Sequence, residues 1–207
     1  VEGAEHIPEK GPVILVGNHL SVIDSFFLPL MIERRVSFLA KSDYFTGKGL
    51  GGWFVKHFML STGQIPIDRS GGKASEASLN TGLQVLDRGE MLAMYPEGTR
   101  SPDARLYRGR TGVARLVLES GATVVPVVMI DTEKAMPIGR KIPRVRRIGT
   151  VIGRPLDFSR FADMSADRFV LRSVTDEIMY EIQQLSGQEY VDVYASSVRA
   201  RMAPTSR

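Results

Sequence analysis

The amino-acid sequence predicts an α/β fold: a single domain with a largely parallel central sheet flanked by helices. Short apolar runs that suit buried strands alternate with segments of helical apolar spacing, which is the order of a parallel sheet with helical crossovers. The chain has 207 residues, of which 43% are hydrophobic. This length and composition suffice for one core and make a second domain unlikely on length alone.

The elements follow in order along the chain. Apolar residues 13–16 come after Gly-Pro and predict a strand, and a helical pattern continues over residues 21–31. Five further strands are expected, at residues 36–40, 64–67, 91–95, 123–130 and 148–152. Helices are expected at residues 77–86 and 113–118, with Gly89 and Gly121 as C-terminal caps.

The C-terminal part predicts packing helices within about residues 165–201. Apolar side chains recur at helical intervals between Arg168 and Gln184, namely Phe169, Leu171, Val174, Ile178 and Ile182. A further helix to about Arg201 precedes a polar tail. No repeat or linker interrupts the chain, so residues 1–207 are interpreted as one domain whose motifs lie within residues 13–130.

Composition excludes several classes of site. The chain has no cysteine, which excludes a disulfide scaffold, a thiolate zinc site and a cysteine nucleophile. A formal net charge of +4 favours anionic partners. No apolar run approaches the ~20 residues of a membrane span, and the start of the chain lacks the pattern of a signal peptide and is interpreted as the entry to a domain.

His19 and Asp24 stand at the end of the first predicted strand, in the stretch GNHLSVIDSFF. Five helical steps turn the chain by about 500°, so the two side chains cannot share one helix face. They can meet if His19 lies in the turn and Asp24 in the first helical turn. Ser21 favours this arrangement, because S-V-I-D is a capping-box pattern with Ser21 as N-cap and Asp24 as the third helical residue.

The residues alone leave two interpretations of this pair open. In the first, Asp24 only caps a helix and His19 only ends a strand. In the second, Asp24 fixes the imidazole tautomer and stabilises its protonated form, which leaves the other ring nitrogen as a general base near neutral pH. No G-x-S-x-G motif supplies a serine, so the hydroxyl that such a base activates belongs to the substrate.

Three later stretches contain further candidate residues. GQIPIDRS places Arg69 at the end of a strand, as an anion clamp or as the partner of Asp68 in a surface ion pair. In MYPEGTRS, residues 97–100 form either an ordinary turn or one whose amides and guanidinium surround a phosphate. Pro126 interrupts the apolar run TVVPVVMI, which predicts an edge strand or a bulge.

The segments NHLSVID, GQIPIDR, YPEGTRS and VVPVVM occur in the order and approximate spacing of the four blocks of the glycerolipid acyltransferase family. Over roughly residues 1–161 the chain resembles the bacterial 1-acylglycerol-3-phosphate members of that family. The resemblance implies transfer of a fatty acyl group from a thioester to the hydroxyl of lysophosphatidic acid, which gives phosphatidic acid in phospholipid biosynthesis. Glycerol 3-phosphate, another lysophospholipid or a glycolipid remains an alternative acceptor.

The resemblance also implies roles for individual residues. It makes His19 the base and Asp24 its partner, with Asn18 and Ser21 shaping the turn. It implies three cations that bind the acceptor phosphate, namely Lys41, Arg69 and Arg100. It assigns the acceptor-binding turn to Glu97, Gly98 and Thr99, and it links Pro126 to the acyl donor. Tyr95 stands where phenylalanine is usual in the family.

The expected mechanism is direct transfer in a ternary complex. The co-substrate is acyl coenzyme A or acyl carrier protein, with no permanently bound cofactor and no metal site. The leaving thiol has a pKa of about 8.5, so its expulsion requires no strong acid and no covalent enzyme intermediate. Amides of the turn at residues 18–21, or of the helix that begins there, are candidate donors to the tetrahedral oxyanion.

Two stretches suit contact with an anionic membrane. Residues 44–63 combine Trp53, Phe54 and Phe58 with lysines, which is typical of an interfacial helix, although these aromatics can equally enter the core. Residues 134–147 are rich in lysine and arginine, and can bind anionic lipid or coenzyme A phosphates or form a solvated loop. The expected location is the cytoplasmic side of the cell membrane, as a peripheral or monotopic protein.

Two functions of other classes compete with this interpretation. The basic stretch and the pI near 9.5 are also compatible with a module that binds nucleic acid or an anionic membrane, which leaves the arrangement of His19 and Asp24 unexplained. For the acyltransferase itself no nucleic-acid partner is expected. A phosphate hydrolase would need a P-loop or a metal cluster, and SGGKAS lacks the spacing of a Walker A loop.

Overall fold

The computed structural model of the chain describes residues 1–67, 73–140 and 142–202. Within these ranges one sheet has the strand order β3-β2-β4-β1-β6-β7. Its strands are β1 (Val13–Gly17), β2 (Val36–Lys41), β3 (Gln64–Ile67), β4 (Met91–Met94), β6 (Thr123–Ile130) and β7 (Gly149–Ile152). All neighbours pair in parallel except β6 and β7, which are antiparallel. The predicted α/β class with a largely parallel sheet is confirmed.

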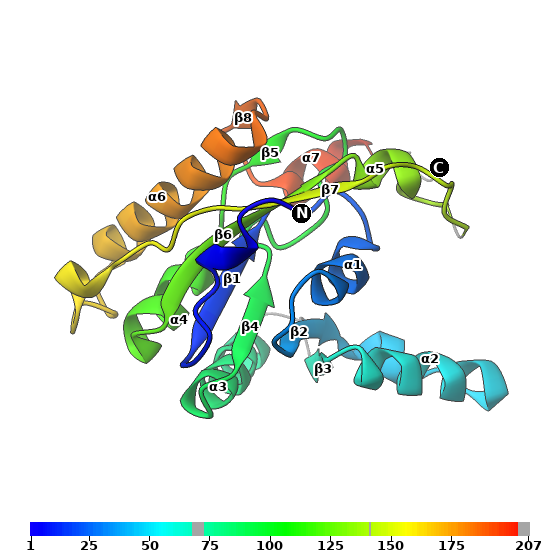
Figure 1. Ribbon diagram of the computed structural model, residues 1–207, viewed down its shortest axis with the longest axis horizontal. Coiled ribbons are helices and arrows are strands. Elements are labelled where there is room, and N and C mark those ends of the chain that lie inside the picture. Colours follow the sequence, from blue (N-terminus) through cyan, green and yellow to red (C-terminus); the bar gives the residue numbers. More distant parts are fainter. Residues whose placement is uncertain (68–72, 141, 203–207) are drawn as a thin grey trace.

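Helices cover both faces of the sheet (Figure 1). The α-helices are α1 (Asp24–Leu30), α2 (Gly49–Ser61), α3 (Lys73–Asp87), α4 (Gly112–Ser120), α5 (Thr132–Ala135), α6 (Arg168–Ser186) and α7 (Ala195–Met202). The short 3₁₀ segments are η1 (Ala4–His6), η2 (Ser42–Phe45) and η3 (Ser159–Phe161). Helices α3, α4 and α6 lie against one face, and α1 lies against the other.

Strand β1 has no polar side chain because both faces of the sheet are buried there. In β1, Ile14 and Val16 pack into the core beneath α3, α4 and α6, whereas Val13 and Leu15 pack into the core that includes Leu28 of α1. None of the four strand residues exposes more than 1% of its surface. A strand buried on both faces shows a continuous apolar run rather than alternation, which is the pattern of residues 13–16.

The C-terminal helices differ in how firmly they pack. Helix α6 buries Val174, Ile178 and Ile182 completely, as the helical spacing predicts. Phe169, predicted to share that face, is 84% exposed, because it lies about two and a half turns before Ile178 and so on the opposite side of the helix. In α7 Ala195 is the one buried residue, so this helix packs less extensively than α6.

Pro126 does not lie on an edge strand, which corrects one of the two predictions for it. Strand β6 is interior, with β1 on one side and β7 on the other. The bulge is the correct alternative. Val127 pairs with Ile152 and Val124 pairs with Leu156, so three steps along β6 face four steps along the segment opposite. That segment therefore has one extra residue opposite the proline. The ladder is thus irregular where Pro126 has no N–H to donate.

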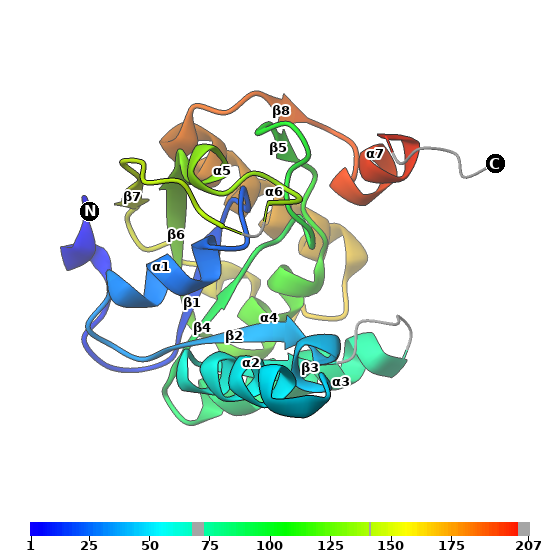
Figure 2. The same cartoon turned by 90° about the vertical axis from the view of Figure 1, so that its right-hand side faces the viewer.

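The parallel arrangement brings the C-terminal ends of β1 and β4 side by side, since Val16 pairs with Met94. The segments that leave these strands, residues 18–23 and 95–105, therefore start at the same edge of the sheet. Beyond them β5 (Leu106–Tyr107) pairs with β8 (Tyr190–Val191) in a small second sheet, beside which α7 lies (Figure 2). The candidate residues gather at this edge.

Candidate active site

His19 and Asp24 meet in the structure. Nδ1 of His19 lies 3.0 Å from Oδ2 of Asp24. Asp24 is completely buried, while the His19 side chain keeps 17% of its surface exposed. The carboxylate thus lies on the inner side of the ring, which directs Nε2 toward the accessible side. The sequence prediction that the turn brings the two side chains together is confirmed.

The backbone of the turn fixes the carboxylate. The same Oδ2 atom accepts hydrogen bonds from the amides of Leu20 and Ser21, both at 2.8 Å. The bond to Ser21 is the reach-back half of the predicted capping box. The other half is wrong: the helix begins at Asp24 with Ile23 as N-cap, and the Ser21 hydroxyl donates instead to the carbonyl of Met136 at 2.7 Å.

Tyr95 stacks on the imidazole of His19. Its ring centroid lies 3.9 Å from that of His19, with 5° between the planes. The phenol oxygen is 3.2 Å from the hydroxyl of Ser25 in α1. Desolvation raises the pKa of Tyr95 well above its ordinary value, and the charge of Asp24 raises it further, so the phenol stays neutral. A neutral aromatic face holds the imidazole plane without adding charge.

Glu97 joins the His19 turn to the turn at residues 97–100. Its carboxylate accepts the His19 amide at 3.2 Å and the Tyr107 amide at 2.9 Å, and only 1% of the residue is exposed. Burial raises the pKa of Glu97 from its ordinary 4.5 to about 8, against the lowering effect of the two amide bonds. The Ser101 amide also donates to the His19 carbonyl at 2.7 Å. The segments NHLSVID and YPEGTRS are therefore joined by hydrogen bonds into one unit.

These bonds engage three of the backbone amides that were expected as oxyanion donors. The amide of His19 donates to Glu97, and the amides of Leu20 and Ser21 donate to Asp24. A carboxylate already occupies each of these three donors, so they serve to position the side chains of the site. The amide of Asn18 and those of the helix stay predictions for the oxyanion donors.

Asn18 anchors the start of the turn to the neighbouring strand. Its side chain donates to the Met129 carbonyl at 3.1 Å and accepts from the Met129 amide at 2.9 Å. It also donates to the side-chain oxygen of Gln188 at 2.8 Å. Only 1% of Asn18 is exposed. It shapes the turn from within, as the resemblance implies.

The acceptor-turn residues lie next to this unit. Gly98 has a φ of 74°, and a side chain there would meet Nε of Arg110 at 3.0 Å, so glycine suits the position on both counts. Thr99 and Arg100 follow, both half-buried. Because the amide of Ser101 donates to the His19 carbonyl, Arg100 is held next to the turn that contains His19.

Pro126 is not brought into this unit, and two predicted cations cannot be placed within the described residues. Pro126 is buried in β6 opposite Val16, behind the end of the sheet. Lys41 ends β2, but its side chain lies outside the described part of the chain, as do Asp68 and Arg69 altogether. The predicted phosphate contacts of Lys41 and Arg69 therefore stay predictions.

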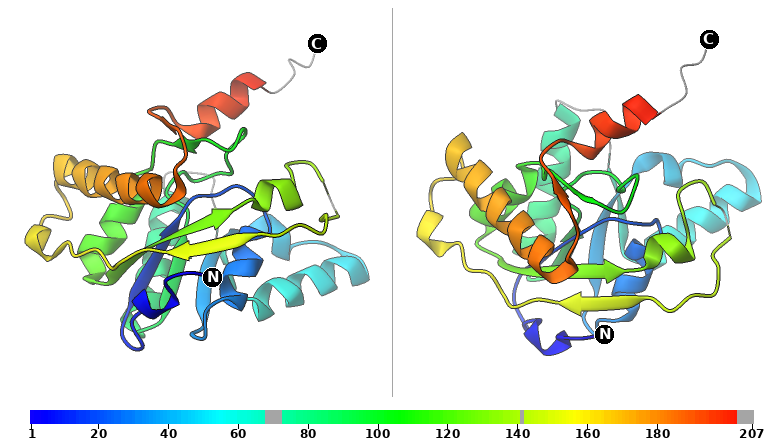
Figure 3. Two further views of the ribbon diagram at one scale, coloured as in Figure 1. Left: turned by 45° about the horizontal axis from the view of Figure 1, so that its top comes forward. Right: turned by 90° about the horizontal axis from the view of Figure 1, so that it is seen from above.

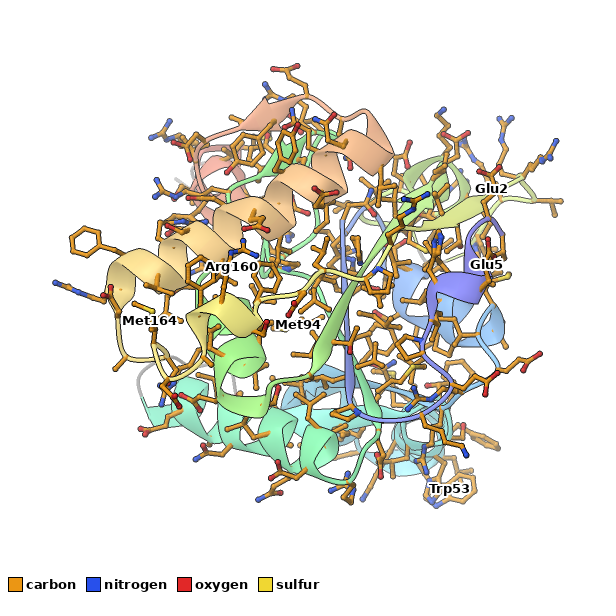
Figure 4. The ribbon with its side chains drawn as sticks, turned by 60° about the vertical axis from the view of Figure 1, so that its left-hand side comes forward. Glu2, Glu5, Trp53, Met94, Arg160 and Met164 are labelled. Carbon is orange, nitrogen blue, oxygen red and sulfur yellow. The ribbon has the colours of Figure 1, made fainter. Side chains whose placement is uncertain are left out.

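Helix α2 exposes its apolar side chains instead of burying them. Leu50, Trp53, Phe54 and Phe58 are 81%, 53%, 65% and 53% exposed, and only Met59 is buried. Trp53 stands at the outer surface, away from the sheet (Figure 4). The alternative that these aromatics enter the core is wrong. No helix in the part of the chain that is described is long and apolar enough to cross a membrane.

The basic stretch after α5 is also exposed. Arg140, Arg144 and Arg146 are exposed there together with two apolar side chains, Ile142 at 77% and Val145 at 103%. This loop and α2 project from the same side of the molecule (Figures 1 and 3).

Comparison with known proteins places the sequence in context. A family model described as Acyltransferase matches residues 1–130. The chain is 29% identical over 162 residues to a chloroplastic 1-acyl-sn-glycerol-3-phosphate acyltransferase of Arabidopsis thaliana, covering 77% of this chain and 44% of that protein. It is 25% identical over 191 residues to the 1-acyl-sn-glycerol-3-phosphate acyltransferase of Bacillus subtilis, covering 91% and 88% respectively.

The fold agrees with a solved structure. The crystal structure of the 1-acyl-sn-glycerophosphate acyltransferase PlsC from Thermotoga maritima matches with a TM-score of 0.65 and 23% identity, over 100% of this chain and 73% of that one. The chain spans about half the length of the plant relatives that it matches. Since the family model matches residues 1–130 of 207, the chain belongs to the acyltransferase family.

Proposed function

We propose that this protein transfers a fatty acyl group from a thioester to the hydroxyl of a 1-acylglycerol 3-phosphate, giving phosphatidic acid. The observation that carries the proposal is the pair His19 and Asp24, joined at 3.0 Å with the carboxylate buried and the imidazole accessible. Relatives that match most of this chain are named 1-acyl-sn-glycerol-3-phosphate acyltransferases, which supports the choice of acceptor. Glycerol 3-phosphate and other lysophospholipids are the acceptors to compare with it.

In the proposed reaction, Nε2 of His19 removes the proton of the acceptor hydroxyl as its oxygen attacks the thioester carbonyl. A positioned base of this kind contributes about 10² to 10⁴ in rate. The side chain of Asp24, hydrogen-bonded to Nδ1, stabilises the imidazolium that forms and fixes the ring orientation. When the tetrahedral intermediate collapses, the C–S bond breaks, the new ester remains, and the thiolate takes the proton back from His19.

The acceptor is proposed to bind through its phosphate. Arg100 supplies a guanidinium beside the catalytic turn, and its fixed geometry suits a phosphate. Lys41 and Arg69 are the further cations proposed from the sequence. Fixing the phosphate also holds the hydroxyl next to His19, so the cations contribute orientation as well as affinity.

The donor is proposed to be acyl coenzyme A or acyl carrier protein, acting as a co-substrate. Each buried CH₂ of an acyl chain is worth about 0.8 kcal/mol, so long-chain substrates stay in lipid and the enzyme has to reach them there. The exposed side chains of α2 and the arginines of the loop after α5 suit an anionic membrane surface. We assign this contact to the cytoplasmic side of the membrane.

The test is thiol release from an acyl thioester by the purified protein, with and without lysophosphatidic acid or glycerol 3-phosphate. The wild type is expected to release thiol only with acceptor, and His19→Ala to lose at least about 10² of this rate while keeping its fold by circular dichroism. Arg100→Ala is expected mainly to raise the KM for acceptor, and Arg168→Ala, an exposed arginine on α6, serves as its charge control.

Thiol release that is undiminished in His19→Ala would overturn the mechanism. A protein that releases no thiol with any phosphate-bearing acceptor, yet binds anionic vesicles or nucleic acid, would favour the binding module instead. A panel of acceptors and acyl lengths in the same assay identifies the preferred substrate.

A further inference from the structure

Residues 188–202 lie outside the range that matches the family model, yet they reach the active site from the far end of the chain. The segment is tied down through β8, which pairs with β5. The side chain of Gln188 donates to the Ala104 carbonyl at 2.6 Å and accepts from Asn18 at 2.8 Å. Ala195, at the start of α7, is completely buried. The C-terminal segment therefore has a fixed place beside both turns of the site (Figure 2).

Arg199 of α7 reaches the acceptor turn directly. Its guanidinium donates to the hydroxyl oxygen of Thr99 at 2.6 Å, a contact between residues 100 positions apart. The direction of this bond is certain, because a guanidinium has only donors. Thr99 is thus the acceptor, and its own hydroxyl proton has to point to another group. A charge-assisted bond of this kind also polarises the hydroxyl and makes it a stronger donor.

A second arginine supports the same turn from behind. Arg110 lies against Gly98 and donates to the Ser196 hydroxyl of α7 at 3.0 Å. Its guanidinium stacks over the ring of Tyr194, 5.1 Å from the centroid. Arg110 thereby connects α7 to the acceptor turn, and the position of Arg199 is fixed by packing rather than by its single bond to Thr99.

We propose that Arg199 is a positioning residue for the acceptor: it orients the Thr99 hydroxyl as a donor toward the anionic headgroup. This inference rests on the proposed function, in which the turn at residues 97–100 binds the acceptor phosphate. Because the guanidinium of Arg199 has no acceptor atom, the Thr99 hydroxyl has to donate its proton to a different group, such as a phosphate oxygen. The C-terminal segment thus contributes to acceptor specificity although it lies far from the sequence motifs.

The experiment measures binding of sn-glycerol 3-phosphate by calorimetry and the KM for acceptor by thiol release, using the whole chain. Arg199→Ala is expected to weaken binding about tenfold and to raise KM by a similar factor with kcat nearly unchanged. Thr99→Val, which keeps the shape but loses the hydroxyl, is expected to do the same. The double variant is expected to bind glycerol 3-phosphate within about twofold of either single variant, since all three variants lose the same interaction.

Arg201→Ala is the matched control, because Arg201 is an exposed arginine of the same helix. A long-range charge effect would weaken binding equally in Arg199→Ala and Arg201→Ala, and this result would overturn the proposal. Additive losses in the double variant, or a lower kcat and melting temperature with unchanged binding, would overturn it as well. If Arg199→Ala does not fold, the loss in Thr99→Val decides the question.

Calorimetry separates this inference from the proposed function, because it does not depend on turnover. A wild type that binds glycerol 3-phosphate through Arg199 and Thr99 but transfers no acyl group would refute the proposed reaction and leave the role of Arg199 supported. A wild type that transfers acyl groups with binding independent of Arg199 would do the reverse. Absence of binding by the wild type would overturn the role of Arg199.

Discussion

Asn18, Asp24 and Glu97 form the floor of the site and expose 1% or less of their surface, whereas α2 and the described residues of the loop after α5, 136–140 and 142–148, expose much of theirs. In the floor, eight hydrogen-bonded contacts link these three polar side chains to neighbouring amides, carbonyls and side chains. At the surface, the aromatic side chains of α2 are more than half exposed, although Trp53 packs edge-on against Phe54 and Phe58 packs against Phe26. The polar groups of the floor are thus held by hydrogen bonds within the protein. The exposed apolar surface of α2 and the loop is instead suited to contact with a binding partner.

Asp24→Asn is expected to have the largest effect on the rate of acyl transfer, because it changes the carboxylate whose Oδ2 atom contacts His19, Leu20 and Ser21. The neutral amide cannot stabilise the imidazolium, and it can present its NH₂ group to Nδ1 and so favour the wrong tautomer. Replacing the carboxylate of a His-carboxylate pair costs about 10³ to 10⁴ in kcat in comparable sites. Steady-state thiol release with saturating acceptor measures the loss. A variant within about tenfold of the wild type would remove Asp24 from the mechanism.

Glu97→Gln is expected to change the pH dependence of stability. The pKa of Glu97 is about 8 in the folded chain and near its ordinary 4.5 in the unfolded chain. Between these values the folded protein keeps a proton that the unfolded chain has released, so stability is present at low pH and falls as pH rises. The group contributes a decrease of a few kcal/mol between about pH 5 and about pH 8.

Chemical denaturation across this pH range measures the decrease. Glu97→Gln is expected to flatten it, because the amide does not titrate. The variant should also be less stable at about pH 5, since glutamine has one acceptor oxygen for two amide donors. Glu9→Gln, at an exposed position, is the control and should follow the wild type. An unchanged slope in Glu97→Gln would mean that Glu97 is ionised throughout.

The part of the floor that is local in sequence could be predicted from the sequence. His19 and Asp24 are five residues apart, and turn geometry alone brings them together. The order of strands and helices follows from apolar periodicity, and the parallel sheet from their alternation. These features depend on residues that are close together along the chain, so local sequence patterns are enough to predict them.

The rest depends on contacts between distant residues. The hydroxyl of Ser21 suits an N-cap locally, but the carbonyl of Met136 lies within reach and takes the bond, over 115 positions. Gln188 meets Asn18 across 170 positions and Arg199 meets Thr99 across 100. A lone glutamine and one arginine among many carry no pattern that marks these pairs. Tyr95 was visible only as a replacement for phenylalanine, since stacking on His19 requires the register of β1 and β4.

The surface of α2 is expected to show the smallest effect, and one that appears only in the presence of lipid. Each exposed aromatic ring gains only part of its transfer free energy at an interface, so Trp53→Ala with Phe54→Ala should weaken binding to anionic vesicles by about tenfold in total. Vesicle sedimentation measures this change. The melting temperature should stay the same, because both side chains are more than half exposed and the floor does not depend on them.

Phe169→Ala provides the matched control for this measurement. Phe169 is 84% exposed, more than either aromatic of the double variant, but it lies on α6, away from α2 (Figure 1). If exposed apolar surface were sufficient for vesicle binding, Phe169→Ala would weaken it as well. If α2 is the contact surface, only the α2 variant weakens binding, and the comparison then separates a surface shaped for lipid from an aromatic side chain that is merely exposed.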